Sequence, residues 1–166
     1  MINKLYMLSS LTFLILIIGC SNNDDLIKQA TEELDYDVLL PSYIPSKLEL
    51  VEVTLEDDRL FLNYQDTEET TFIEFSQRQF ARGIDTERFL EFTETGEDPY
   101  EKFPKLSYRE IGNYVGEYED REKIHRLSFM FIPSVPRSQI DNYPFYHIRA
   151  VGIDEEDFHK VVRSLN

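Results

Sequence analysis

The chain has 166 residues, which is near the usual size of a single domain and long enough to bury a core. It carries 32 acidic and 17 basic side chains, and its formal net charge is −15 at pH 7. This charge argues against nucleic acid as a partner, because binding there requires lysine and arginine to neutralise phosphates.

The first twenty residues resemble the signal of a bacterial lipoprotein. Lys4 supplies a positive start, the run from Leu11 to Ile18 supplies an apolar core, and Gly19 is a small residue at the cleavage site. The stretch from Ile17 to Cys20 is similar to the lipobox, whose enzymes attach diacylglycerol to the cysteine thiol and then cleave before it. The resemblance implies that Cys20 becomes the lipidated N-terminus, carrying acyl chains of the palmitate kind.

The alternative interpretation is a single-pass membrane anchor built from residues 5–18. A span needs about 20 apolar residues, and this segment is interrupted by two serines. We therefore prefer the lipoprotein, and both interpretations leave the rest of the chain outside the cytoplasm. The preferred one predicts a signal peptide at residues 1–19, a lipidated tether at residues 20–25 and a single extracytoplasmic domain at residues 26–166.

The mature chain is then expected to contain no free cysteine, because Cys20 is the only one. Its stability must come from a packed core rather than from disulfides. Loss of Lys4 with the signal leaves 16 basic and 32 acidic side chains, a net charge of −16. Anionic lipid headgroups repel such a surface, so we expect the domain to stand away from the bilayer. Solubility explains this charge more simply than a dedicated site for a cationic ligand does.

Directly after the tether, apolar residues recur at helical spacing. They predict a short helix that ends near Leu34, with Asp24 or Asp25 as its cap. Pro41 and Pro45 then predict a loop, because proline lacks a backbone hydrogen-bond donor.

Alternating apolar residues next predict three antiparallel strands, at about 48–53, 60–64 and 71–76. The links between them, at residues 56–58 and 66–69, are short and polar, as in hairpins. The alternation changes phase near Leu50, which indicates either a β-bulge or a strand buried on both faces.

Residues 81–105 lose this periodicity, although they contain many acidic and aromatic side chains. We expect an excursion with no more than one irregular turn of helix. Such a segment is a candidate docking site for a partner, and a solvated insertion that covers one sheet edge is an equal alternative.

Strand patterns resume in the second half of the chain, at 108–111, 114–118, 127–132 and 145–151. Gly112 and Gly116 are candidate turn or bulge positions.

The clearest helix follows the last of these strands. Asp154 is its expected N-cap, acidic residues fill its first turn, and Lys160 and Arg163 lie at its other end. Its apolar stripe consists of Phe158, Val161, Val162 and Leu165. These elements predict an α+β fold, with an antiparallel meandering sheet, a short N-terminal helix and a C-terminal helix packed on the sheet.

The segment from Leu40 to Pro45, the paired strands through Tyr64 and Phe75, and the ending from Tyr146 to Leu165 resemble domain-of-unknown-function family 4367. The resemblance covers about residues 38–166. This family occurs largely on membrane-anchored proteins of spore-forming Gram-positive bacteria. It therefore implies a surface domain on the cell membrane of such a bacterium, and no established activity.

The sequence contains little recognisable chemistry. His125 lies at a strand start, His147 inside the last strand and His159 on the expected exposed side of the final helix. Without paired histidine or cysteine ligands we predict no metal site, and we expect structural roles for all three. Nucleophile elbows, calcium loops and glycine-rich phosphate loops are also missing from the sequence, so we predict no catalytic residue, no cofactor and no enzyme activity. Cys20, as the lipidation site, is the single predicted site residue.

Three hypotheses from different classes follow. The preferred one is a membrane-anchored binding or sensing module of the cell envelope, with an envelope protein as its candidate partner. The second is a carrier of lipid or another apolar ligand, and the third is an extracytoplasmic hydrolase. A large apolar cavity would favour the carrier, and a cluster of His, Asp and Ser in a cleft would favour the hydrolase. A filled core with an exposed aromatic patch would favour the binding module. The oligomeric state is left open.

Overall fold

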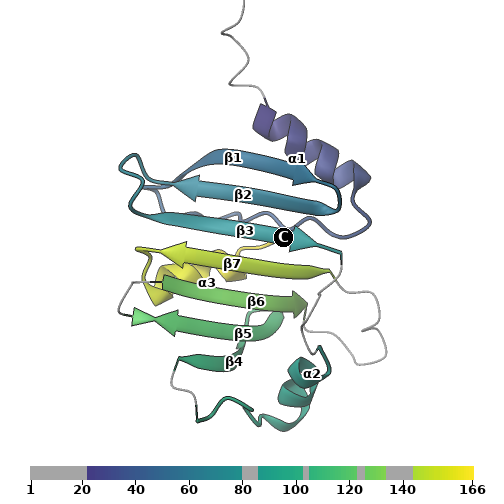
Figure 1. Cartoon of the computed structure of the whole chain (residues 1–166), viewed down its shortest axis with the longest axis vertical. Coiled ribbons are helices and arrows are strands. Elements are labelled where there is room, and N and C mark those ends of the chain that lie inside the picture. The colour runs from purple at the N-terminus through teal and green to yellow at the C-terminus, as the bar shows by residue number, and fades with distance from the viewer. Residues whose placement is uncertain (1–21, 80–85, 103–104, 123–125, 134–143) are drawn as a thin grey trace, which may run out of the picture.

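The described part of the chain contains seven strands and three helices (Figure 1). The structure is a computed structural model that describes residues 22–79, 86–102, 105–122, 126–133 and 144–166. The helices are α1 (Asn22–Glu33), α2 (Thr86–Thr95) and α3 (Glu155–Arg163). The strands are β1 (Glu49–Glu56), β2 (Arg59–Gln65), β3 (Phe72–Arg78), β4 (Leu106–Ile111), β5 (Tyr114–Arg121), β6 (Arg126–Pro133) and β7 (Phe145–Val151). Cys20 and the signal predicted at residues 1–19 lie outside the described residues.

The described strands form one antiparallel sheet with the order β1-β2-β3-β7-β6-β5-β4. Strands β1 to β3 are one meander, and β4 to β6 are another (Figure 1). The last strand, β7, joins the two meanders, because it pairs with β3 on one side and with β6 on the other. The predicted α+β fold with an antiparallel meandering sheet is confirmed.

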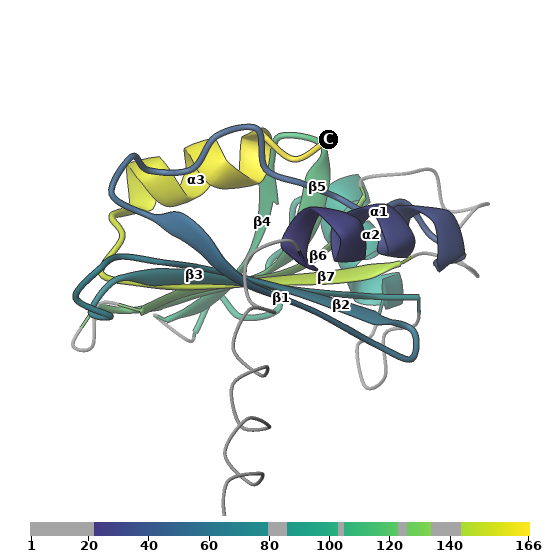
Figure 2. The same ribbon diagram turned by 90° about the horizontal axis from the view of Figure 1, so that it is seen from above.

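Helices α1 and α3 lie over the same face of the sheet, which we call the helix face (Figure 2). An apolar core lies between this face and the helices, because every second strand residue points toward the apolar stripe of α3. In that stripe Phe158, Val161 and Val162 are fully buried. Burying such surface contributes about 25 cal/mol for each Å² of apolar area, and this is the main driving force for the fold.

Helix α1 begins earlier than expected. Residues 22–25, which we predicted as tether, belong to its first turn. Asp24 and Asp25 therefore lie inside the helix rather than capping it, and their charges are near the positive end of the helix dipole. None of the described helices has the length and apolar character that crossing a membrane requires.

The C-terminal helix is confirmed, with Asp154 as its N-cap. A side-chain oxygen of Asp154 accepts a hydrogen bond from the backbone N–H of Asp157 at 2.8 Å. Beyond α3, the backbones of Leu40 and Asn166 exchange two hydrogen bonds, at 3.0 and 3.2 Å. The proline loop is thereby tied to the end of the chain.

The first meander agrees with its sequence pattern. The register between β1 and β2 shifts between Leu50 and Glu52, which confirms the β-bulge. Asp57 and Glu69 adopt φ values of 52° and 58° in the two predicted hairpin turns.

The two glycines that we expected at turns or bulges differ from one another. Gly112 has a φ of 64° in the turn between β4 and β5, as predicted. Gly116 lies within β5, and the register of β5 continues past it without a bulge, so that prediction is wrong. Close backbone approach explains this glycine, because a Cβ at position 116 would lie 2.0 Å from the Met130 carbonyl oxygen and 2.7 Å from Phe131 Cα.

The segment between the meanders contains more helix than predicted. We expected no more than one irregular turn within residues 81–105, but α2 is 10 residues long. It packs against β4 and β5, and Leu90 is buried at 2% exposure. Tertiary packing stabilises short helices that have little stability of their own, which explains why the sequence pattern underestimated α2.

Candidate functional site

The candidate site lies on the face of the sheet opposite α1 and α3, which we call the open face. Strand register places two rows of side chains across it. One row consists of Thr54, Phe61, Ser76, His147, Met130, Glu117 and Tyr108. The next row consists of Glu52, Asn63, Glu74, Arg149, Ser128, Glu119 and Leu106. Each row crosses both meanders, so it joins residues that are far apart in the sequence.

We call the open face of β4, β5 and β6 the α2 half, because α2 and the residues after it cover the part around Tyr108. A small buried cluster lies there, made of Tyr108, Val115 and Ile132. Phe92 and Tyr100 pack on this cluster, with ring centroids 5.8 and 5.2 Å from that of Tyr108. Tyr100 Oη also donates a hydrogen bond to Glu117 Oε2 at 3.0 Å. Tyr108 and Glu117 therefore have partners in the α2 half, whereas Arg126 Nε on β6 is a buried atom without a hydrogen-bond partner among the described residues.

The part of the open face on β1, β2, β3 and β7 contains a pocket of about 580 Å³, and we call it the pocket half. All the residues that line the pocket belong to these four strands. The polar side chains of the lining include Glu52, Thr54, Asn63, Glu74, Ser76 and Arg149. The volume is within the range of small-ligand sites, about 300 to 1,000 Å³.

Glu74 and Arg149 are cross-strand neighbours in the pocket and form an ion pair. Arg149 Nη2 lies 2.5 Å from Glu74 Oε2, and Arg149 Nε donates to the same oxygen at 2.7 Å. The guanidinium also lies 5.3 Å from the centroid of the Phe72 ring. Both paired side chains are about 40% exposed, so the pair contributes little stability and mainly fixes the position of Arg149.

Three acceptor groups in the pocket have no partner among the described residues. Asn63 Oδ1 is buried and accepts no hydrogen bond. Glu52 and Glu56 are exposed on the edge strand β1, and no described side chain pairs with either carboxylate. An unsatisfied buried acceptor costs about 1–3 kcal/mol. Arg126 Nε and His159 Nε2 are also buried without a hydrogen-bond partner among the described residues, so this feature is not confined to the pocket.

His147 lies at the side of the pocket and hydrogen-bonds to Ser128 on β6. The distance between Ser128 Oγ and His147 Nε2 is 2.8 Å. Burial, followed by the charges of Arg149, Arg126 and Arg78, lowers the pKa of His147 to about 4. The imidazole is therefore neutral at physiological pH, which is consistent with the structural role that we expected for it.

The Ser128 and His147 pair resembles part of a nucleophilic dyad, but two features weaken this interpretation. A base with a pKa of about 4 accepts a proton poorly at neutral pH. Within the described residues, moreover, no carboxylate bonds to the second ring nitrogen to orient the imidazole.

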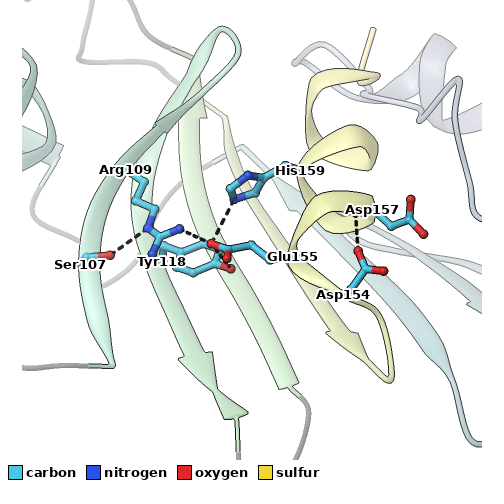
Figure 3. Close-up of polar contacts among 7 residues, drawn as sticks. All are labelled: Ser107, Arg109, Tyr118, Asp154, Glu155, Asp157 and His159. Carbon is cyan, nitrogen blue, oxygen red and sulfur yellow. Dashed lines mark hydrogen bonds and ion pairs between the residues drawn. The ribbon is translucent and has the colours of Figure 1, made fainter.

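A second polar cluster lies on the helix face, where α3 meets β4 and β5 (Figure 3). Arg109 Nη1 donates to Glu155 Oε1 at 2.5 Å, and Arg109 Nε donates to Ser107 Oγ at 3.2 Å. The guanidinium of Arg109 lies over the Tyr118 ring, 3.9 Å from its centroid. The hydrogen bond from Arg109 lowers the pKa of the Glu155 carboxyl, and burial raises the pKa of Tyr118. These contacts join α3 to the edge of the sheet, so we assign them a structural role.

His159 belongs to this helix-face cluster, so our prediction that it lies on the exposed side of α3 is wrong. Its side chain is 20% exposed, and its ring centroid is 5.8 Å from that of Tyr118. The error arises because Phe158 and His159 both pack against Tyr118, although only Phe158 belongs to the apolar stripe. Burial lowers the pKa of His159.

The structure does not bring together Cys20, the single predicted site residue, and the three histidines that the sequence analysis considered. Cys20 and His125 lie outside the described residues, His147 projects from β7 on the open face, and His159 belongs to α3 on the helix face. No group of three His, Cys, Asp or Glu side chains within the described ranges could hold a metal ion.

Sequence analysis missed the pocket because its residues occupy ordinary outward positions of four strands. The available signal was weak: Asn63 is a small polar side chain between Leu62 and Tyr64 in β2, and Ser76 follows Phe75 in β3. That pattern is also typical of any strand with one solvated face.

Comparisons with protein-family models and with curated proteins give no match. The resemblance to domain-of-unknown-function family 4367 therefore stays a prediction. Among solved structures, a protein from Bacteroides thetaiotaomicron VPI-5482 aligns with 12% sequence identity and a TM-score of 0.42. The alignment covers 74% of this chain and 42% of that one, so this chain spans less than half of that protein's length. A TM-score of this size supports no inference about function.

Proposed function

We propose that this chain is a lipid-anchored extracytoplasmic protein of a bacterial cell envelope, and that it binds a protein partner through the pocket half of its sheet. The anchor is supported by the lipobox-like stretch from Ile17 to Cys20 and by the single cysteine of the chain. The binding role is supported by the pocket in the pocket half and by the polar side chains that line it.

The single observation that carries the binding role is the pocket on β1, β2, β3 and β7. Its lining contains a buried acceptor without a described partner, Asn63 Oδ1, and the carboxylates of Glu52 and Glu56, of which Glu56 lies opposite Arg59 in the register of β1 and β2. Polar side chains that line a pocket of this size can recognise a partner that supplies complementary groups.

The anchor is tested by Cys20→Ala in the full chain. We expect the protein to leave the membrane fraction or to remain unprocessed, because the thiol that receives diacylglycerol is gone. Acyl labelling and membrane fractionation measure this directly. Equal labelling of the variant and the unmodified chain would contradict the proposal.

Photo-crosslinking in native cells tests the binding surface. A photoreactive amino acid at Thr54 or Ser76 reports on the pocket half, and the same group at Glu91 of α2 reports on the segment that we first considered as a docking site. We expect one discrete crosslinked protein from Thr54 and Ser76. Crosslinks from Glu91 alone would move the binding surface to α2 and overturn the assignment to the pocket half.

The carrier and the hydrolase make distinct predictions. A carrier would retain lipid, which native mass spectrometry of the full chain in mild detergent detects, but carboxylates in the pocket lining do not suit an acyl chain. The hydrolase is favoured by the hydrogen bond between Ser128 and His147. Labelling by a fluorophosphonate that is lost in Ser128→Ala would support it over a binding module.

A further inference from the structure

We infer that the domain stands upright on the membrane, with the β1 edge of the sheet toward the bilayer and the α2 end away from it. This inference rests on the proposed lipid anchor at Cys20, and it adds which part of the domain faces the lipid surface. It also makes the pocket half the membrane-proximal half of the sheet.

The link between the anchor and the folded domain is short. Sequence analysis predicted a tether at residues 20–25, but α1 begins at Asn22. Only Cys20 and Ser21 therefore lie between the predicted cleavage site and the helix. A chain extends at most about 3.6 Å for each residue, so the Cα atom of Asn22 lies within about 7 Å of that of the lipidated Cys20.

Helix α1 is packed onto the sheet, so it does not lengthen this link. Ala30 is fully buried in the main core, and Leu26, Ile27 and Leu34 pack against that core. The helix contacts β1, and Figure 1 shows it beside β1 at the outer end of the strand order. The lipidated residue is therefore held near the β1 edge.

The other edge of the sheet is far from the anchor. Strands β1 and β4 are the two edges of the described sheet, with six strand spacings between them. At about 4.8 Å for each spacing, the two edges are about 29 Å apart. Helix α2 packs against β4 and β5, so it lies at the end remote from α1 (Figure 1). A domain anchored near one end can stand on that end or lie flat on one face.

Charge favours the upright position over the flat one. After loss of the signal the net charge is −16, and anionic lipid headgroups repel it. This repulsion acts within about 8 Å of the surface at physiological ionic strength. A flat domain brings acidic side chains from the whole sheet into that layer, whereas an upright domain brings in only those of α1 and the β1 end. Repulsion therefore turns the rest of the sheet away, while the short link keeps the β1 end near the bilayer.

The upright position limits how a partner reaches the pocket. The pocket is lined by β1, β2, β3 and β7, which are the first four strands counted from the anchored edge. It therefore lies within three strand spacings, about 14 Å, of that edge. A protein that is itself embedded in the membrane can reach this height with a short extracytoplasmic segment. The α2 half projects away from the membrane.

Energy transfer to labelled lipid tests the orientation. The acylated full chain is placed in vesicles of phosphatidylcholine and phosphatidylglycerol that contain an acceptor lipid labelled on its headgroup. A thiol-reactive donor is attached to Glu56→Cys on β1 or to Glu110→Cys on β4, since both glutamates are exposed and each change removes the same charge. The thiol of Cys20 does not react, because it carries the diacylglycerol. Transfer from position 56 should be at least about twofold more efficient, because the two edges differ by about 29 Å in height.

A longer link is the control for the geometry. A flexible insertion of about 20 glycine and serine residues between Ser21 and Asn22 has a root-mean-square length of about 25 Å. It should leave acylation and vesicle binding unchanged and reduce the transfer from Glu56→Cys. Unchanged transfer in the insertion variant would mean that the short link does not hold the β1 end at the bilayer, and it would overturn the inference.

Two further results would also overturn the inference. Equal transfer from Glu56→Cys and Glu110→Cys would show that the domain lies flat, and stronger transfer from Glu110→Cys would place the β4 edge at the bilayer. A second distal label at Glu97→Cys, an exposed position after α2, should give the same low transfer as Glu110→Cys.

Failure of this inference is distinguishable from failure of the proposed function. A purified chain without acyl groups that does not bind vesicles would reject the proposed anchor, and the orientation with it. An acylated, vesicle-bound chain with equal transfer from both edges would reject the orientation alone.

Discussion

The two halves of the open face are built from the same outward strand positions, yet only the α2 half has a helix packed on it. In the α2 half, Tyr108 is covered by Phe92 and Tyr100, and Glu117 accepts a hydrogen bond from Tyr100. In the pocket half, Asn63 Oδ1 and the carboxylate of Glu52 are unpaired among the described residues. The comparison indicates that packing fixes the side chains around Tyr108, whereas the side chains of the pocket half line a pocket that a ligand can reach.

The largest expected effect comes from breaking the sheet beneath the α2 half. Gly116→Ala places a methyl group 2.0 Å from the Met130 carbonyl oxygen, which forces β5 and β6 apart. We expect a loss of more than about 4 kcal/mol of stability, or failure to fold. Circular dichroism and denaturant unfolding measure it. Gly96→Ala is the control, since its Cβ meets nothing within 4 Å and the variant loses only the advantage of glycine at positive φ, about 1 kcal/mol. Similar stabilities of the two variants would contradict the close approach.

The second-largest expected effect is a dependence of folding stability on pH, which arises from His147 in the pocket half. His147 has a pKa of about 4 in the folded chain and an ordinary value of 6.5. Between these values the unfolded state binds a proton that the folded state does not, so stability present above pH 6.5 is lost as the pH falls towards 4. The loss from this group should be on the order of 3 kcal/mol.

His147→Gln should reduce the change in folding stability between pH 6.5 and pH 4, because the titrating group is removed. Denaturant unfolding at pH 7 and pH 4.5 measures the slope. His159→Gln, on the other face of the sheet, is the matched control. This variant should retain most of the pH dependence of stability. An unchanged profile in His147→Gln would mean that other groups carry the pH dependence.

A smaller effect should distinguish aromatic residues in the two halves. Phe92→Ala removes a ring that covers Tyr108, and it should cost about 2 kcal/mol because Phe92 is only partly buried. Phe61→Ala in the pocket lining should cost about 1 kcal/mol or less, since its outward side faces the pocket. Thermal or denaturant unfolding compares the two variants. Equal costs would show that the pocket half is packed as well as the α2 half.

The smallest effect concerns single polar groups. Tyr100→Phe removes the hydroxyl that donates to Glu117, and it should destabilise the fold by about 1 kcal/mol. Asn63→Leu should have no such cost. The denaturant midpoints of the two variants measure these changes in stability. A larger loss of stability in Asn63→Leu than in Tyr100→Phe would show that the asparagine supports the fold.

Much of the architecture could be predicted from local patterns. The last strand was predicted at residues 145–151, which are the limits of β7, and Asp154 was identified as the cap of α3. The length of α2 was missed because its apolar residues are stabilised only by contact with β4 and β5. His159 was misplaced because its burial depends on Tyr118, a residue from another element.

The sequence by itself determined where the strands alternate, where proline and turn residues interrupt them, and which stripe of the final helix is apolar. These properties depend on residues a few positions apart, and local periodicity records them. Only the tertiary structure decided that β7 lies between the two meanders, that α2 covers one half of the open face, and that Asn63 and Arg149 line one pocket. Strand pairing over long separations depends on complementary packing across the whole sheet, which no local pattern in one sequence contains.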